Sequence, residues 1–503
     1  MNILRPETLI PLFVILPLGA AFLNSFLGER IKGFSDIIAN IITAVLLVLS
    51  IFAAYLVNIS GVLVYKVGMW VPPIGIALVL DGLSAFMLFT VNLIAFFITA
   101  YSANYMEKYT QKGKFYTLLL LMLAGMEGVI ITGDIFNLFV FLEIASVASY
   151  ALVAYGTEAE ELEASFKYLV MSSLGSTFVL LGIALVYGYA STLNMADVAL
   201  TLVQKGPSKI IPFVSVLFLM GFGLKAALVP FHAWLPDAHP SAPAPISAML
   251  SGVLIKTLGV YALVRIFYNV IGINATVLSI FMFLGTLSMV AGVFLAIGQW
   301  DMKRLLAYHS ISQIGYVVLG LGLGTPLGIL GGLFHLFNHS VFKSLLFLNA
   351  GAVEYSIGSR DLKEMGGLRE KMPVTAGTSL VASMSIAGIP PFNGFWSKLL
   401  IILAALQAGQ LTYAFFAVLA SILTLASFMK VQKYAFFGSL KKVHEDVKEV
   451  PVFMRGAMVM LAFICIVGGV LIIPGISKVF LDAAKDVVAG GTNYANNVFG
   501  SIK

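Results

Sequence analysis

Long apolar stretches recur along the whole chain and are separated by short polar segments. About fourteen of them are long enough for a membrane-spanning helix, beginning near residues 8, 34, 80, 115, 134, 164, 211, 245, 273, 305, 326, 374, 411 and 456. A helix needs about twenty apolar residues to cross the hydrocarbon core of a bilayer. The pattern therefore predicts an all-α polytopic membrane protein with about fourteen transmembrane helices.

Proline interrupts two of the predicted spans. LVPFHAW at 228–234 follows the apolar run from about Ile211, and IPPFNGFW interrupts the segment 374–408, which is too long for one straight span. Broken helices at matching places in two halves of a chain are typical of inverted-repeat transporters, so we predict a faint internal repeat. The aromatic, proline and glycine residues of YKVGMWVPPIGIALVLDG predict an interfacial hairpin between the second and third spans. The last residues, about 478–503, predict a short surface helix.

Composition agrees with a membrane protein and indicates an orientation. The 503 residues are 60% hydrophobic and 11% charged, whereas soluble domains carry about 25% charged residues. If the N-terminus lies outside, the inside loops hold 18 Lys and Arg residues, the outside holds 8, and four lie within spans. Basic residues collect in cytoplasmic loops, so this bias predicts a protein of the cell membrane with both termini outside. The net charge of +6 therefore does not indicate nucleic-acid binding.

Cys465 is the only cysteine, and it lies within an apolar run. One cysteine excludes an internal disulfide, a four-cysteine iron–sulfur site and a CxxCH haem site in this chain.

Ionisable residues fall at membrane depth in several spans. Lys225 lies roughly 20 Å and Lys256 roughly 16 Å from the start of its segment, near the middle of a core about 30 Å thick. Glu143 lies roughly 14 Å beyond Asp134. The other candidates at this depth are Glu127, His309, His335, His339, Lys343 and Lys398. Charges at this depth are costly and usually functional.

Structural explanations compete with a functional one for these residues. A buried Lys–Glu pair could fix helix packing, and His309 or Glu127 could be satisfied locally. His335 and His339 could bind a metal, but no third ligand is visible, so we predict no metal site. The same histidines could ligate haem. His335, His339 and Lys343 are spaced four apart and share one helical face. Carboxylates, lysines and histidines bridged by water can pass protons through a segment without an open pore, and we favour such a proton path.

Four motifs occur in a recognisable order: GDIFNLFVFLEIASVASY, GLKAALVPFHAWLPDAHPSAPAPISAMLSGVLIK, KRLLAYHSISQIGY and LFHLFNHSVFKSLLF. Together they resemble the antiporter-like subunits of respiratory complex I, of Mrp sodium/proton antiporters and of membrane-bound hydrogenases. The resemblance covers nearly the whole chain and is greatest to the Mrp D-type subunit. It implies two inverted five-helix repeats, helices 4–8 and 9–13, with broken helices 7 and 12. The corresponding units are 1–110 with helices 1–3, 111–270 and 271–440 with the two repeats, and 441–503 with helix 14 and a tail.

The resemblance also implies residue roles. Glu143 and Lys225 would form an ion pair between helices 5 and 7, and Lys256 would be the relay of helix 8. The central connection would comprise His309, His335, His339 and Lys343. Lys398 would be the exit residue of helix 12, where some relatives carry glutamate. Glu127 and His232 are further candidates to which the resemblance assigns no role.

The sequence therefore predicts a proton-translocating membrane subunit, one that could also exchange protons for sodium. It would have no cofactor or redox centre of its own. It would work beside other membrane subunits, including further antiporter-like ones, in an ion-pumping oxidoreductase or in an Mrp antiporter. Peripheral redox subunits could be further partners. One alternative is a membrane subunit that binds haem or quinone, which an absorption spectrum would test for haem. The other is a self-sufficient transporter of a solute, which would have a mid-membrane pocket between the repeats instead of a row of charges.

Overall fold

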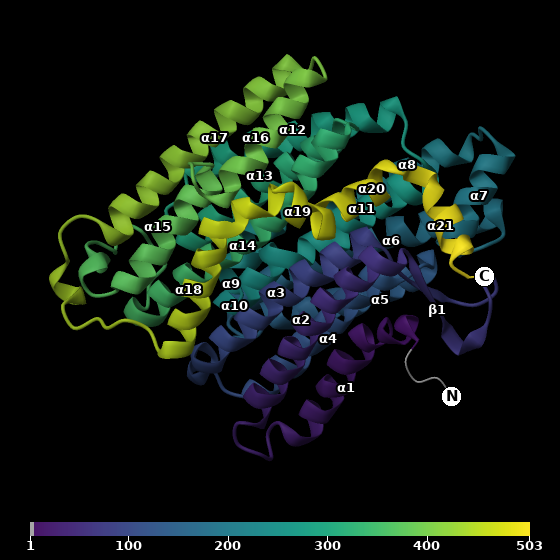
Figure 1. The fold of residues 1–503 in the computed structure, drawn as a ribbon. Coiled ribbons are helices and arrows are strands. Elements are labelled where there is room, and N and C mark those ends of the chain that lie inside the picture. Colours follow the sequence, from purple (N-terminus) through teal and green to yellow (C-terminus); the bar gives the residue numbers. More distant parts are fainter. Residues whose placement is uncertain (1–4, 503) are drawn as a thin grey trace.

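Fourteen spans follow one another in residues 5–502, the part of the chain that this computed structural model describes (Figure 1). Each begins within about five residues of the position that apolar patterning predicts. They are α1 (Leu12–Leu27), α2 (Phe34–Ser60), α3 (Gly82–Tyr105), α4 (Lys112–Ile131), α5 (Ile135–Val153), α6 (Ala159–Ala190), α8 (Ile210–Lys225) with α9 (Leu235–Ser241), the segment Ala244–Ile271, α12 (Ala275–Ile297), α13 (Met302–Gly322), α14 (Pro326–Ile357), α15 (Pro373–Ala387) with α16 (Asn393–Gln407), α17 (Leu411–Val431) and α18 (Val452–Val467). The all-α polytopic fold is thus confirmed.

Hydropathy alone identifies eleven of these helices as long and apolar enough to cross a membrane. α8 and α15 are shorter because each is half of an interrupted span. α14 is not among the eleven although it has 32 residues. Its buried surface carries polar side chains, namely those of His335, Asn338, His339 and Lys343. These polar side chains lower the hydropathy of a helix that the protein surrounds, so lipid does not contact them.

Both interruptions expose backbone groups that side chains then satisfy. α8 ends at Lys225, and the indole Nε1 of Trp234 donates to the carbonyl of Leu224 over 3.1 Å. α15 ends at Ala387, and Lys398 Nζ donates to the carbonyl of Ile386 over 2.7 Å. Unpaired backbone groups are tolerated at membrane depth only where protein or water satisfies them. The predicted breaks in spans 7 and 12 are confirmed.

The segment Ala244–Ile271 is the innermost span, and its apolar window is entirely buried. It begins with α10 (Ala244–Met249) and includes α11 (Ala262–Val264), with wider π-helical turns at Leu250–Leu254, Lys256–Tyr261 and Arg265–Ile271. Gly259 lets it approach the end of α8 closely, because a Cβ there would lie 2.4 Å from Ala226 Cα. A larger residue at position 259 would push this segment and the end of α8 apart.

The predicted interfacial hairpin is present. β1 (Leu63–Lys66) pairs antiparallel with β2 (Ala77–Leu80), with Leu63 opposite Leu80. The C-terminal tail forms α19 (Pro474–Ser477), α20 (Ala483–Ala489) and α21 (Tyr494–Gly500), and it crosses one side of the bundle (yellow in Figure 1). α7 (Met195–Lys205), which the sequence did not predict, is an amphipathic helix between spans 6 and 7 that packs against α21. Further short turns are Pro6–Leu9, Val67–Met69, Met106–Lys108, Leu368–Glu370, Gln432–Phe436, Lys442–His444, Gly468–Ile472, Lys478–Asp482 and Gly491–Asn493.

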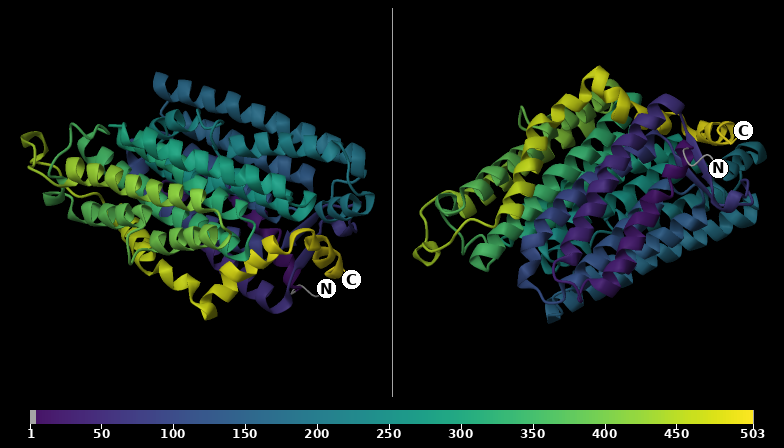
Figure 2. Two further views of the ribbon diagram at one scale, coloured as in Figure 1. Left: turned by 90° about the horizontal axis from the view of Figure 1, so that it is seen from above. Right: turned by 60° about the horizontal axis from the view of Figure 1, so that its bottom comes forward.

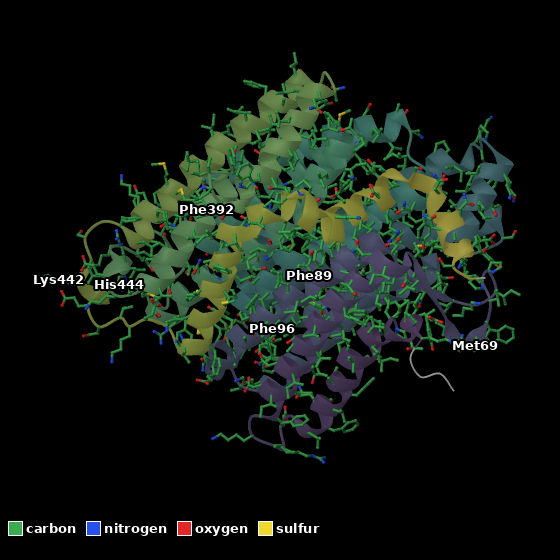
Figure 3. All side chains as sticks on the ribbon, in the orientation of Figure 1. Met69, Phe89, Phe96, Phe392, Lys442 and His444 are labelled. Carbon is green, nitrogen blue, oxygen red and sulfur yellow. The ribbon has the colours of Figure 1, made fainter. Side chains whose placement is uncertain are left out.

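The described ends of the chain lie at one face of the bundle. Arg5 and Ile502 line the same hollow beside the hairpin, and Lys66 Nζ donates to the Ile502 carbonyl over 3.3 Å. We call this the hairpin face, and Figure 2 shows both ends near it. The opposite face, the loop face, carries the loops that follow α5, α12, α14 and α17. Figure 3 labels Met69 of the hairpin and Lys442 of the last of these loops at opposite ends of the molecule.

Candidate functional site

Glu143 and Lys225 form an ion pair between α5 and α8. Lys225 Nζ lies 3.6 Å from Glu143 Oε1. The lysine side chain is 2% exposed and the glutamate side chain 31%, so the carboxylate faces the side of the bundle and the amine faces the interior. The structure brings together the two residues that the sequence predicts to pair.

Serines complete the surroundings of this pair. Lys225 Nζ donates to Ser146 Oγ over 2.9 Å and to Ser172 Oγ over 2.6 Å, and Ser176 Oγ donates to Glu143 Oε1. Ser172 and Ser176 lie one turn apart on α6, so α6 offers hydroxyls to both members of the pair. The sequence analysis missed these serines, although their four-residue spacing was visible.

Lys256 lies in a π-helical turn and has no carboxylate partner among the described residues. Its Nζ donates to the carbonyl of Ser251, and its side chain is fully buried. Ser251 Oγ lies 2.7 Å from Ser310 Oγ on α13. A hydroxyl pair therefore joins the Lys256 segment to the helix that carries His309.

The helices α13 and α14 carry the central group. His309 Nε2 lies 2.8 Å from Ser427 Oγ of α17, and Lys343 Nζ donates to the carbonyl of Leu306, one turn before the histidine. His309 and Lys343 are fully buried. Among residues 5–502, their hydrogen bonds to neighbouring helices thus go to neutral oxygen atoms.

His335 and His339 continue the row along α14. His335 Nδ1 lies 2.9 Å from Ser397 Oγ, and its Nε2 lies 3.2 Å from Gln313 Oε1. The rings of His335 and His339 are stacked with their centroids 6.3 Å apart. Within residues 5–502, neither ring nitrogen of His339 has a hydrogen-bonding partner, so this side chain is free to accept a proton.

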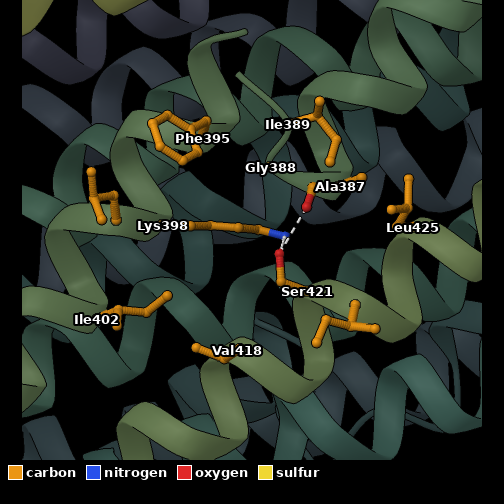
Figure 4. A pocket seen from close by; sticks show the side chains of 11 residues that line it. Ala387, Gly388, Ile389, Phe395, Lys398, Ile402, Val418, Ser421 and Leu425 are labelled. Atoms are coloured by element: carbon orange, nitrogen blue, oxygen red, sulfur yellow. Dashed lines mark hydrogen bonds between the residues drawn. The ribbon is translucent and has the colours of Figure 1, made fainter. Parts of the chain in front are cut away.

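Lys398 ends the row beside the second break. Its Nζ also approaches Ser421 Oγ at 3.3 Å and lies 4.7 Å from the ring centroid of Tyr316, which stands 5.3 Å from the His335 ring. Figure 4 shows Lys398 and Ser421 pointing toward each other at the base of a crevice of about 250 Å³. The crevice is otherwise mostly apolar and opens between α15, α16 and α17. The lysine is therefore reachable from the side of the bundle.

Two further candidates lie apart from this row. Glu127 of α4 is fully buried, and neither carboxylate oxygen has a hydrogen-bonding partner among residues 5–502. His232 is half-buried in the turn between α8 and α9, and its Nδ1 is likewise without a partner in this range. The structure shows no contact of either with the row.

The structure also reveals ionisable residues that the sequence analysis missed. Lys303, interpreted from the sequence as a loop residue, is only 2% exposed and pairs with Glu354 at 2.6 Å. His239 is fully buried in α9, and neither ring nitrogen has a partner among the described residues. The predicted sequence motifs contained both side chains, but only the fold places them near the row.

Comparisons with known proteins identify the relatives of this chain. The family model described as NADH:quinone oxidoreductase/Mrp antiporter matches residues 132–424, and that described as NADH-ubiquinone oxidoreductase (complex I), chain 5 N-terminus, matches residues 70–116. The chain is 35% identical over 437 residues to the D-type subunit of a Na(+)/H(+) antiporter of Alkalihalophilus pseudofirmus, covering 86% of this chain and 88% of that protein. It is 37% identical over 381 residues to the N-type subunit of the NADH-quinone oxidoreductase of Desulforudis audaxviator, covering 75% of this chain and 76% of that protein.

Two solved structures share the fold. A chain of the Mrp complex from a Dietzia species superimposes with a TM-score of 0.91 at 28% identity, covering 99% of this chain and all of that one. A chain of a membrane-bound sulfane sulfur reductase, an archaeal respiratory membrane complex, superimposes with a TM-score of 0.89 at 33% identity, covering 97% of this chain and 99% of that one. The overall fold of this chain thus has counterparts in these two complexes.

Proposed function

This chain belongs to the NADH:quinone oxidoreductase/Mrp antiporter family, and we propose that it relays protons along its row of buried ionisable residues. The row begins at the Glu143–Lys225 pair, includes Lys256 and the central group, and ends at Lys398. The membership confirms the prediction of a proton-translocating membrane subunit of a multi-subunit complex. Other membrane subunits are accordingly its partners.

The observation that carries the proposal is the scarcity of carboxylates along the row. Of its four buried lysines, only Lys225 has a carboxylate partner in residues 5–502. Lys256, Lys343 and Lys398 contact carbonyl or hydroxyl oxygens instead. A buried charge kept for structure is normally paired, because an unpaired one is strongly destabilising. A proton relay requires lysines that alternate between charged and neutral forms, and such lysines need no permanent partner.

The Glu143–Lys225 pair is suited to act as the switch of the relay. Its separation of 3.6 Å is longer than a direct hydrogen bond, and serines hold both members from other sides. A small movement of α5 relative to α8 therefore changes the field at Lys225, while Ser172 of α6 can keep its hydrogen bond to the amine. A neighbouring negative charge favours a charged lysine, so this movement would change the proton affinity of the amine.

Orientation and sodium exchange complete the proposal. The hairpin face, with both chain ends, would lie outside the cell membrane and the loop face inside, which the bias of 18 to 8 basic residues supports. Exchange of protons for sodium is supported by relatives whose names describe Na(+)/H(+) antiporters.

The test replaces a lysine at the centre of the row. In the intact complex, Lys343→Ala should lower proton movement into sealed vesicles by at least about tenfold, because general acid–base groups typically contribute a hundredfold or more. The matched control is Lys433→Ala, which removes an exposed lysine in the turn that follows α17. Proton movement by an assembled Lys343→Ala complex that equals the control would refute the relay. Repeating the measurement with and without sodium tests the exchange.

A further inference from the structure

A polar hollow lies on the loop face, where α14 ends. It encloses about 480 Å³ at the ends of α6, α9, α13 and α14. Its lining includes Glu160, Ser241, Asp301, Glu354 and Arg360. Such a concentration of charged side chains attracts water and cations to one point of an otherwise apolar bundle.

Glu354 connects this hollow with the buried interior. Its side chain is 27% exposed, and its Oε2 lies 2.6 Å from Nζ of Lys303, whose side chain is 3% exposed. Lys303 Nζ also donates to the carbonyl of Ala242 over 3.2 Å, at the end of α9. The carboxylate thus lines the hollow while the amine lies behind it, inside the protein.

His239 of α9 lies three residues before Ala242, whose carbonyl accepts the hydrogen bond from Lys303. Its ring lies 4.7 Å from the ring of Phe347, and Lys343 Nζ lies 5.4 Å from the same ring. These two distances place the imidazole and the central amine no more than about 10 Å apart, a gap that two or three water molecules can bridge. Because both ring nitrogens lack partners in residues 5–502, the imidazole can accept and release a proton.

Resting on the proposed function, we propose that Glu354, Lys303 and His239 form the route by which protons pass between the loop-face hollow and the centre of the row. In the inward direction, the Lys303 ammonium gives a proton to a neutral His239 ring, leaving a neutral amine and an imidazolium. Glu354, which has taken up a proton from hydronium in the hollow, then gives this proton to the neutral Lys303 amine and becomes a carboxylate again. The imidazolium passes its proton through water to Lys343.

Arg360 has a different role in the hollow. Its Nε lies 3.2 Å from Asp301 and 3.9 Å from Glu354, and its Nη2 lies 3.4 Å from Glu160. Burial opposes its charge, but Asp301, Glu354 and Glu160 outweigh this effect and hold the pKa of the guanidinium above its ordinary value. Arg360 therefore stays charged and positions Glu354, and it takes no part in proton transfer.

The competing explanation is that Glu354 and Lys303 form a merely structural ion pair between α13 and α14. Replacing both residues by neutral glutamine distinguishes this explanation from the proposed route. Glu354→Gln should lower proton movement of the intact complex by at least about tenfold, whereas Glu354→Asp should keep most of it. The double variant Lys303→Gln with Glu354→Gln contains no unpaired buried charge, so it should assemble and yet remain inactive. The matched control is Glu163→Gln, an exposed carboxylate at the start of α6 on the same face.

Two results would overturn the route: near-control activity of an assembled Glu354→Gln complex, or recovery of activity in the double variant. If Glu354→Gln alone fails to assemble, the double variant gives the answer. Lys343→Ala is measured in the same vesicles. Loss of activity in Lys343→Ala beside normal activity in Glu354→Gln refutes only the uptake route, whereas normal activity in both refutes the relay itself.

Discussion

Removing either member of the Glu143–Lys225 pair should stop transport while leaving the complex assembled. At 3.6 Å and an effective dielectric constant of about 20, two unit charges attract each other by about 4–5 kcal/mol. Lys225 also makes hydrogen bonds to Ser146 and Ser172, and bonds to a charged group contribute about 1.5–3 kcal/mol each. Glu143→Ala therefore removes about half of what holds the ammonium, which stays in place but loses its control.

Further variants distinguish a switch from a simple attraction. Lys225→Ala should abolish transport, because the amine that carries the proton is gone. Lys225→Arg should fail as well, since arginine keeps the positive charge but does not release its proton at accessible pH. The double replacement Glu143→Ala with Lys225→Ala should be as inactive as either single one, because groups that act as a unit are not additive.

The assay is proton pumping by the intact complex in sealed vesicles, with assembly checked on the same samples. Glu163→Ala is the matched control, since that carboxylate is 68% exposed and lies outside the row. Near-normal pumping by an assembled Lys225→Ala or Lys225→Arg complex would refute the switch.

The remaining predictions concern topology, assembly and stability. Cysteine placed at Lys503, with Cys465→Ala to remove the native thiol, should be labelled from outside, and labelling only after the membrane is opened would reject the orientation. The single polypeptide in liposomes should show little or no transport, and robust sodium-driven proton movement from it would contradict the need for partners. Asp81→Asn should destabilise the protein by about 3–5 kcal/mol, because it removes the carboxylate that pairs with buried Arg265 at 2.7 Å; an unchanged thermal unfolding midpoint would contradict this. Gly259→Ala should likewise lower that midpoint, since its Cβ would meet the Ala226 backbone at 2.4 Å. An unchanged midpoint would show that the segment Ala244–Ile271 and the end of α8 can move apart at little cost.

Apolar patterning predicted most of the fold because each span must by itself be long and apolar enough to cross the bilayer. The start of α14 was predicted even though its hydropathy is low, because Gly322, Gly324 and Thr325 precede Pro326 and indicate a turn before a helix. α7 was not predicted, since an amphipathic surface helix of 11 residues has no hydropathy signal comparable to that of a span. Its place became clear only from its contact with α21, a helix almost 300 residues later.

The candidate site was predicted in part for a related reason. Lys225 and Lys398 stand out because charge is rare in an apolar segment. Lys303 does not stand out, since it lies beside Arg304 at the start of a span and looks like any basic residue of a loop. Its partner Glu354 is 51 positions away at the end of the following span. Proximity between the ends of neighbouring helices depends on their packing, which no local sequence pattern reports.

The Glu143–Lys225 and Glu354–Lys303 pairs share one arrangement. In each pair the carboxylate is partly exposed, 31% for Glu143 and 27% for Glu354, while the lysine behind it is 2–3% exposed. In both pairs, a negative charge therefore lies at the boundary of the interior. The inner members of the row are lysines and histidines, which are neutral or positively charged. Because like charges in a low-dielectric interior repel one another, these inner groups cannot all be protonated at once. In the proposed relay, a proton gained at one end would then be balanced by one released further along, and Glu143 and Glu354 are placed to control that exchange.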